Sequence, residues 1–211
     1  MLLSKRIIYF VVTLFIISMV ISGTSYAYTY LTKEKALQEV FGTECTFTTE
    51  SVRLKDSLLK SIKNRLGGKL VYYQDGSESE NVLEQKKIEF YYAVKDGKKI
   101  GIAIIDTQPG KWGPVEFIIG MDLKPNVTNV AVMRFREKRG RPIANKSFMN
   151  QYTGKNSRSP LNVGDDIVAV SGATISSRAA TFAVKKALVL VEECLHIKSA
   201  KENINFRKIY L

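Results

Sequence analysis

The pattern of apolar and polar residues changes its period after residue 69. From Leu70 onward, apolar residues alternate with polar ones or form short β-branched and aromatic runs, as they do in strands. We predict strands at 70–74, 87–94, 99–106, 115–122 and 127–135, with an exposed loop at 76–83. Tight turns at 95–98, with its Asp-Gly pair, and at 123–126 would join neighbouring strands. The pattern therefore predicts a largely antiparallel sheet.

Apolar residues recur at helical spacing in three other segments. Thr32 can cap a helix that runs through Phe41 and stops at Gly42. A second helix is predicted at about 55–66, and a third at about 177–195, with its apolar face turned to the sheet. The expected fold class is α+β, with helices packed on the sheet. We divide it into a helical cap segment at 28–68 and a main domain at 69–198.

The N-terminal 27 residues have the composition of a targeting segment. Lys5 and Arg6 precede an apolar run at 7–21, and Ser25-Tyr26-Ala27 resembles a signal-peptidase site. The run is shorter than the roughly 20 residues of a spanning helix, so a cleaved signal peptide and an uncleaved membrane anchor are the two alternatives. Both predict an extracytoplasmic domain, periplasmic or on the outer face of the membrane. We expect the C-terminal tail at 199–211 to be loose.

Composition narrows the possible chemistry. The chain is 45% hydrophobic and 25% charged, as folded domains are, and carries a formal charge of +12. Export argues against nucleic acid as a partner, whereas an anionic membrane surface or an acidic redox partner would suit the charge. Two cysteines are too few for an iron–sulfur cluster with four Cys ligands, and the chain has no Cys-x-x-Cys-His sequence for an attached c-type haem. Redox chemistry in this chain would therefore require an organic cofactor.

The sequence Ser171-Gly172-Ala173-Thr174-Ile175-Ser176-Ser177-Arg178 is the strongest candidate for a binding site. It follows a β-branched run at 167–170 and opens the third helix, so we predict a strand, a tight turn and a helix. Glycine allows a close backbone approach, and the N–H groups at a helix start attract anions, phosphate above all. Arg178 adds a bidentate donor. The plainer interpretation of the motif is a capped helix after a turn.

The segment 164–179, which contains this motif, closely resembles the signature of the FMN-binding domain family. That family includes one subunit of the sodium-translocating NADH:quinone reductase and one of the Rnf electron-transport complex. The stretches 136–140 and 148–155 are similar to two other segments of the family, in the same order, and the resemblance covers about 91–193. It implies FMN as the cofactor. The residues implied to hold the phosphate are Ser171, Gly172, Ala173, Thr174, Ser176, Ser177 and Arg178, with Glu137, Gly140 and Gln151 nearer the flavin ring.

The resemblance also implies how FMN is attached. In the family, the last Thr of this motif carries FMN through a phosphoester bond made by a flavin transferase, and the corresponding residue is Thr174. Flavinylated members usually have Asp where this chain has Val168, with Asp165 and Asp166 upstream. Covalent and non-covalent binding therefore remain alternatives. Trp112, in a Gly/Pro-rich loop, either covers the flavin ring or packs over the sheet edge.

The function that these features predict is electron transfer. We expect an exported FMN-binding flavoprotein, a module of a membrane-associated redox chain, whose partners are redox proteins at the membrane. No general base or nucleophile is evident, which favours an electron carrier over an enzyme with its own substrate. The alternatives are a flavin-dependent reductase with a small-molecule substrate and a non-redox binding or scaffold protein.

Overall fold

A computed structural model describes residues 28–29, 31–72, 87–111, 113–135 and 141–209. The predicted signal or anchor at 1–27 lies outside the described residues. So do the loop at 76–83, Trp112, and two residues that the resemblance implies near the flavin ring, Glu137 and Gly140. Among the described residues, no helix is both long and apolar enough to cross a membrane.

The described strands form one six-stranded antiparallel sheet, which confirms the predicted fold class. Its order is β1-β6-β5-β4-β3-β2. The strands are β1 (Tyr28–Thr29), β2 (Thr46–Arg53), β3 (Lys87–Lys95), β4 (Lys98–Pro109), β5 (Pro114–Asp122) and β6 (Val127–Phe135). The β3–β4 hairpin turns through Asp96 and Gly97, whose φ angles of 51° and 72° are those of a two-residue type I′ turn. Four of the five predicted strands thus have counterparts in the structure.

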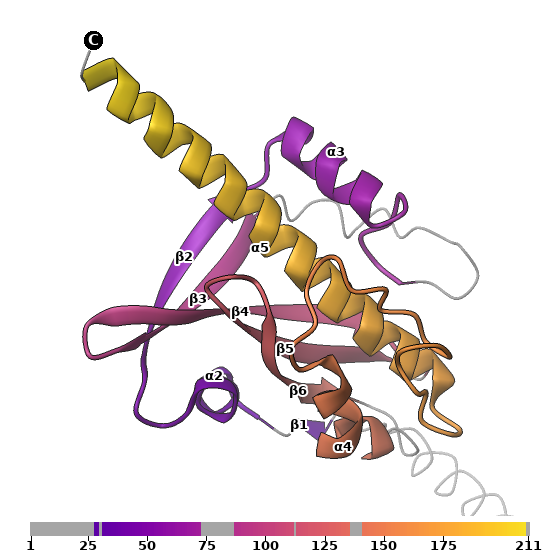
Figure 1. The fold of residues 1–211 in the computed structure, drawn as a ribbon. Helices are drawn as coiled ribbons and strands as arrows, with labels where there is room; N and C mark the ends of the chain where they lie inside the picture. Colours follow the sequence, from indigo (N-terminus) through magenta and orange to yellow (C-terminus); the bar gives the residue numbers. More distant parts are fainter. Residues whose placement is uncertain (1–27, 30, 73–86, 112, 136–140, 210–211) are drawn as a thin grey trace, which may run out of the picture.

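Helices cover both faces of this sheet (Figure 1). On one face, α2 (Lys33–Phe41) packs against β5 and β6, and its N-cap Thr32 and C-cap Gly42 are the predicted ones. The cluster beneath it consists of Ala36, Leu37, Val40, Tyr91, Ala103, Ile118 and Met133. Gly120 permits this close approach, because a Cβ there would lie 1.9 Å from Cγ1 of Val40.

The opposite face carries the larger core, under α5 (Thr174–Ile209). This helix packs against β4 and β5, and α3 (Asp56–Arg65) lies along it (Figure 1). Alternate residues of the strands point into this core, as in Phe90 and Tyr92 of β3 and Ile102 and Ile104 of β4. Arg65 of α3 pairs with both Glu192 and Glu193 of α5, which fixes the two helices together at their exposed rim.

Several predicted elements are wrong in detail. Residues 70–72 are not a strand, whereas the unpredicted β2 pairs with β3 along its whole length. The run at 167–170 is not a strand either; its one bridge joins Ile167 to Val163. The last helix begins at Thr174 and continues to Ile209, so most of the expected loose tail is helical. Cys45 and Cys194 are both buried and are not joined by a disulfide.

Candidate flavin site

The turn before α5 is closed by one backbone hydrogen bond. The N–H of Ala173 donates to the carbonyl of Val170 at 3.0 Å, so Ser171 and Gly172 are the central residues of the turn. Gly172 has a φ of 74°, the conformation that the third residue of a type II turn requires. A Cβ on Gly172 would meet no protein atom within 4 Å. The backbone conformation therefore favours glycine, and a side chain here would project into the space beside the turn.

The helix start next to this turn presents donors to solvent. The first intrahelical bond runs from the N–H of Ser177 to the carbonyl of Ala173 at 2.9 Å. The N–H groups of Thr174 and Ile175 precede that bond, at the positive end of the helix dipole. Ser171, Gly172, Thr174 and Arg178 are exposed, while Ala173 is buried. Backbone N–H groups, the hydroxyls of two exposed residues and the guanidinium of the exposed Arg178 are the kinds of donor that fit a phosphate.

Two predicted phosphate ligands are placed differently. Ser176 and Ser177 are 1% and 0% exposed. The Ser177 hydroxyl donates to the carbonyl of Ala173 at 3.0 Å and accepts from the N–H of Val170 at 3.1 Å. Because its N–H is also bonded to Ala173, Ser177 holds the turn together from inside. The predicted contact of the Ser177 N–H with phosphate is therefore corrected.

The side chain of Gln151 is bonded to the chain just before the turn. It belongs to η3 (Asn150–Tyr152), which follows α4 (Lys146–Met149), in agreement with the short helix predicted at 148–155. The N–H of Val168 donates to Oε1 of Gln151 at 2.8 Å, and Nε2 donates to the carbonyl of Val168 at 3.2 Å. Both ends of the Gln151 amide are thus bonded to the chain that leads into the turn.

Asp166 organises the loop before the turn. Its carboxylate accepts from the N–H groups of Asn162 at 2.7 Å and Leu161 at 3.2 Å, and from Nζ of Lys155 at 2.9 Å. Desolvation raises the pKa of Asp166, but the bonds from Lys155 and the two N–H groups outweigh it and hold that pKa below its ordinary value. The carboxylate of Asp166 is therefore hydrogen-bonded within the loop and stabilises its conformation. Val168, where the family's Asp is expected, is 70% exposed.

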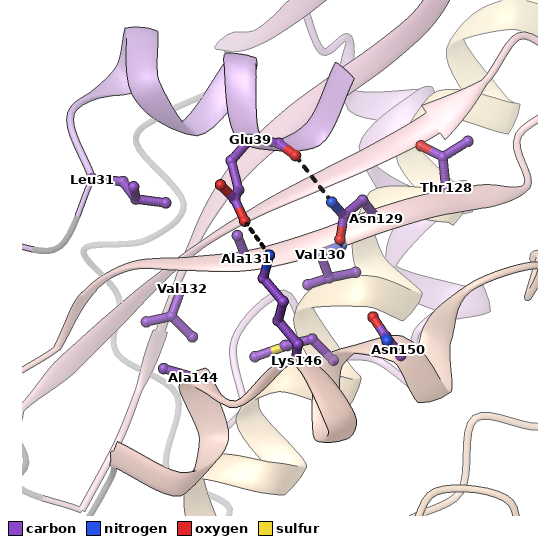
Figure 2. Close-up of a pocket in the computed structure, with 11 residues that line it drawn as sticks. Leu31, Glu39, Thr128, Asn129, Val130, Ala131, Val132, Ala144, Lys146 and Asn150 are labelled. Carbon is purple, nitrogen blue, oxygen red and sulfur yellow. Dashed lines mark hydrogen bonds and ion pairs between the residues drawn. The ribbon is translucent and has the colours of Figure 1, made fainter. Parts of the chain in front are cut away.

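Two cavities among the described residues lie away from this turn. Figure 2 shows one of about 490 Å³ between α2, β6 and α4, where Glu39 pairs with Lys146 at 3.3 Å and Nδ2 of Asn129 donates to the Glu39 carbonyl. A second, of about 550 Å³, lies between the β5–β6 turn and the segment 156–158. Neither is lined by a predicted flavin residue. Glu137 and Gly140, which the resemblance implies near the flavin ring, lie outside the described residues.

Sequence reasoning missed a buried ion pair under α5. Lys186 donates to Oδ1 of Asp106 at 2.7 Å, and Nε2 of Gln108 donates to the other carboxylate oxygen. Oε1 of Gln108 in turn accepts from the N–H of Tyr72 at 2.8 Å. The available signal was that Asp106 and Gln108 alternate directly after the apolar run at 100–105 of β4. This network ties β4, α5 and the chain at Tyr72 together.

One family model matches the part of the chain that contains this turn. Residues 110–189 match the model of the FMN-binding domain family, a segment that contains the turn and the start of α5. Among solved structures, NqrC of Shewanella oneidensis is 13% identical, with a TM-score of 0.46, and the match covers 72% of this chain and 82% of that one. A Na(+)-translocating NADH-quinone reductase component of Parabacteroides distasonis ATCC 8503 is 17% identical, with a TM-score of 0.45, covering 77% and 82%. No curated protein matches the chain.

The class defined by the fold and the site is thus an α+β protein with a glycine-containing turn at an exposed helix start. Within that class, the resemblance to the FMN-binding domain family is confirmed by the match over residues 110–189. FMN is accordingly its cofactor, and the protein is a flavoprotein.

Proposed function

We propose that this protein is an exported electron carrier, a module of a membrane-associated redox chain that holds FMN at the turn before α5. The observation that carries the proposal is the exposed, glycine-containing turn and helix start inside the segment that matches the FMN-binding domain family. When bound, flavin accepts and releases one or two electrons, and the protein sets its position and solvent access.

The residues proposed to bind the phosphate act by complementary charge and hydrogen bonding. The N–H groups of Thr174 and Ile175 and the hydroxyls of Ser171 and Thr174 would donate to phosphate oxygens, and Arg178 would offset the negative charge. Glu137 and Gly140 are proposed to lie nearer the ring, on the family resemblance. Ser177 keeps the turn in shape through its bonds to Ala173 and Val170.

Thr174 is the proposed attachment point if the flavin is covalently bound. It is exposed at the first residue of α5, where a transferase can reach its hydroxyl. In that reaction the Thr174 oxygen would form a bond to the FMN phosphorus of flavin adenine dinucleotide. The P–O bond to the adenosine monophosphate part would break, this part would leave with the bonding electrons, and the hydroxyl proton would pass to the transferase.

Denaturation of flavin-loaded protein tests this attachment. Flavin should stay on the unfolded wild-type chain and on the matched Ser171→Ala control, and should be absent from unfolded Thr174→Ala. Complete release from wild-type protein made with an active transferase would leave a non-covalent site.

Export is proposed from Lys5, Arg6 and the apolar run at 7–21. N-terminal sequencing of protein from the native cell tests it. A chain that begins at Tyr28 supports a cleaved signal peptide, and one that begins at Met1 in the membrane fraction supports an anchor. Recovery of all the protein from the cytoplasm would contradict both forms of the proposal.

The carrier role is tested by mixing reduced protein with membranes from the native host in the absence of oxygen. The flavin should be reoxidised in a reaction that slows as salt is raised, because the +12 charge would steer encounter with acidic redox partners. Reoxidation by small-molecule acceptors alone, with no effect of membranes, would contradict the carrier role.

A further inference from the structure

A chain of buried hydroxyl groups lies behind the proposed phosphate turn. Thr181 lies one helical turn beyond Ser177 and is 5% exposed. Its hydroxyl donates to the carbonyl of Ser177 at 2.9 Å, and the same oxygen lies 2.9 Å from the hydroxyl of Tyr152. A threonine hydroxyl has one proton to donate. Since that proton goes to Ser177, Tyr152 must be the donor in its contact with Thr181.

Tyr152 is placed to act only as a donor. Its side chain is 0% exposed, and its ring packs edge-on against Phe148 with the centroids 5.7 Å apart. Burial raises the pKa of Tyr152, and although the hydrogen bond with Thr181 works in the opposite direction, the charge of Asp166 adds to the rise. The phenol therefore keeps its proton at physiological pH.

The neighbouring residue, Gln151, holds the chain on the other side of the turn. Its amide pairs with both the N–H and the carbonyl of Val168, two residues before the turn begins at Val170. Gln151 and Tyr152 are consecutive in η3, and η3 packs on β6. Through η3, the sheet thus holds the chain on both sides of the turn, at Val168 before it and at Ser177 and Thr181 after it.

We propose that Gln151 and Tyr152 are positioning residues that set the geometry of the phosphate turn from behind, Gln151 through Val168 and Tyr152 through Thr181 and Ser177. This inference rests on the proposed phosphate site. It assigns Gln151 a task at the backbone of the turn in place of the expected contact near the flavin ring. Neither residue touches the phosphate itself.

Affinities for FMN and for riboflavin, which lacks the phosphate, separate positioning from general stability. We would titrate both flavins into full-length protein produced without a flavin transferase. Tyr152→Phe and Thr181→Val each remove one hydroxyl and keep the shape of the side chain. Thr181→Ser keeps the hydroxyl, so it should restore binding. Tyr91→Phe is the matched control, because Tyr91 is also buried and donates to Glu89 at 2.6 Å, on the other face of the sheet.

We expect Tyr152→Phe and Thr181→Val to bind FMN about three- to tenfold more weakly, the range expected for one hydrogen bond. Gln151→Leu, which loses both bonds to Val168, should show the same effect. Riboflavin affinity should stay at the wild-type value in all three, and Thr181→Ser and Tyr91→Phe should bind FMN as the wild type does. Thermal unfolding of each variant reports its cost in stability separately.

Unchanged FMN affinity in Tyr152→Phe and Thr181→Val, or equal losses for FMN and riboflavin, would overturn the positioning role. A wild-type protein that binds FMN no more tightly than riboflavin would instead refute the phosphate site on which the inference rests.

Discussion

Replacement of Gly172 by alanine should change two quantities that can be measured separately: the stability of the apo-protein, through backbone strain, and its affinity for FMN. Gly172 has a φ of 74°, and a Cβ added there meets no protein atom within 4 Å. The stability cost in the absence of ligand is therefore backbone strain alone, about 1–2 kcal/mol for an alanine in the left-handed region. For a chain of this size, each kcal/mol lowers the unfolding temperature by roughly 2–4 °C.

Gly97 provides a closely matched control. Its φ is 72°, its Cβ would also meet nothing within 4 Å, and it lies in the β3–β4 hairpin. Gly97→Ala and Gly172→Ala should therefore lose the same stability, measured by thermal unfolding of apo-protein. Any reduction in the entropy of the unfolded chain is equal in the two variants and cancels in the comparison.

Only Gly172→Ala should weaken FMN binding. Loss of a single charge-assisted hydrogen bond to the phosphate costs about 1.5–3 kcal/mol, which is roughly a 10- to 150-fold rise in the dissociation constant. Fluorescence titration of apo-protein with FMN measures it. If Gly172→Ala binds FMN within about twofold of Gly97→Ala, the turn does not hold the phosphate and the reasoning fails.

Three further outcomes follow from packing and charge. Lys186→Met should lower the free energy of unfolding by about 3–5 kcal/mol in urea denaturation, since it leaves Asp106 charged and 8% exposed. Adding Asp106→Asn should recover most of the loss, and a double variant no more stable than Lys186→Met would contradict this. Gly120→Ala should lower the free energy of unfolding by about 1–3 kcal/mol through overlap with Val40, and adding Val40→Ala should restore part of that loss. Equal urea midpoints for Gly120→Ala and wild type would exclude the overlap. Folding lowers the pKa of Asp166, so the stability that this carboxylate contributes is complete above about pH 4 and is lost as the pH falls through the folded pKa. Asp166→Asn should therefore be less stable than wild type at neutral pH. A difference in unfolding free energy between the two proteins that does not narrow by about pH 3 would refute this.

The sequence alone predicted the elements in which buried apolar residues recur at regular spacing. Strands β3 to β6 carry continuous or alternating apolar residues, and Thr32 and Gly42 are local signals for the ends of α2. Strand β2 was missed because it is an edge strand whose side chains are exposed or half-buried, with hydroxyls at Thr46, Thr48, Thr49 and Ser51. Its stability comes from pairing with β3, which no local pattern reveals.

The sequence predicted where the candidate site lies but not the hydrogen bonds within it. The turn at Gly172 and the helix start follow from residue types that act locally. The β-branched run at 167–170 suggested a strand, yet the backbone of Val168 pairs with the side chain of Gln151. Likewise, the hydroxyl of Ser177 turns inward to Ala173 because a tertiary fold closes around it. The Gln151–Val168 contact joins positions 17 residues apart, and the inward orientation of Ser177 goes with its burial, so residue spacing alone could not show either.

The absorption spectrum of the protein purified from its native compartment tests the central claim most directly. We expect flavin absorbance at one FMN per chain that is bleached by chemical reduction and returns on reoxidation. In protein made without a flavin transferase, loaded with FMN and then washed, this absorbance should be largely lost from Gly172→Ala but kept in Gly97→Ala. Wild-type protein that is folded, yet carries no flavin absorbance and gains none when FMN is added, would contradict it.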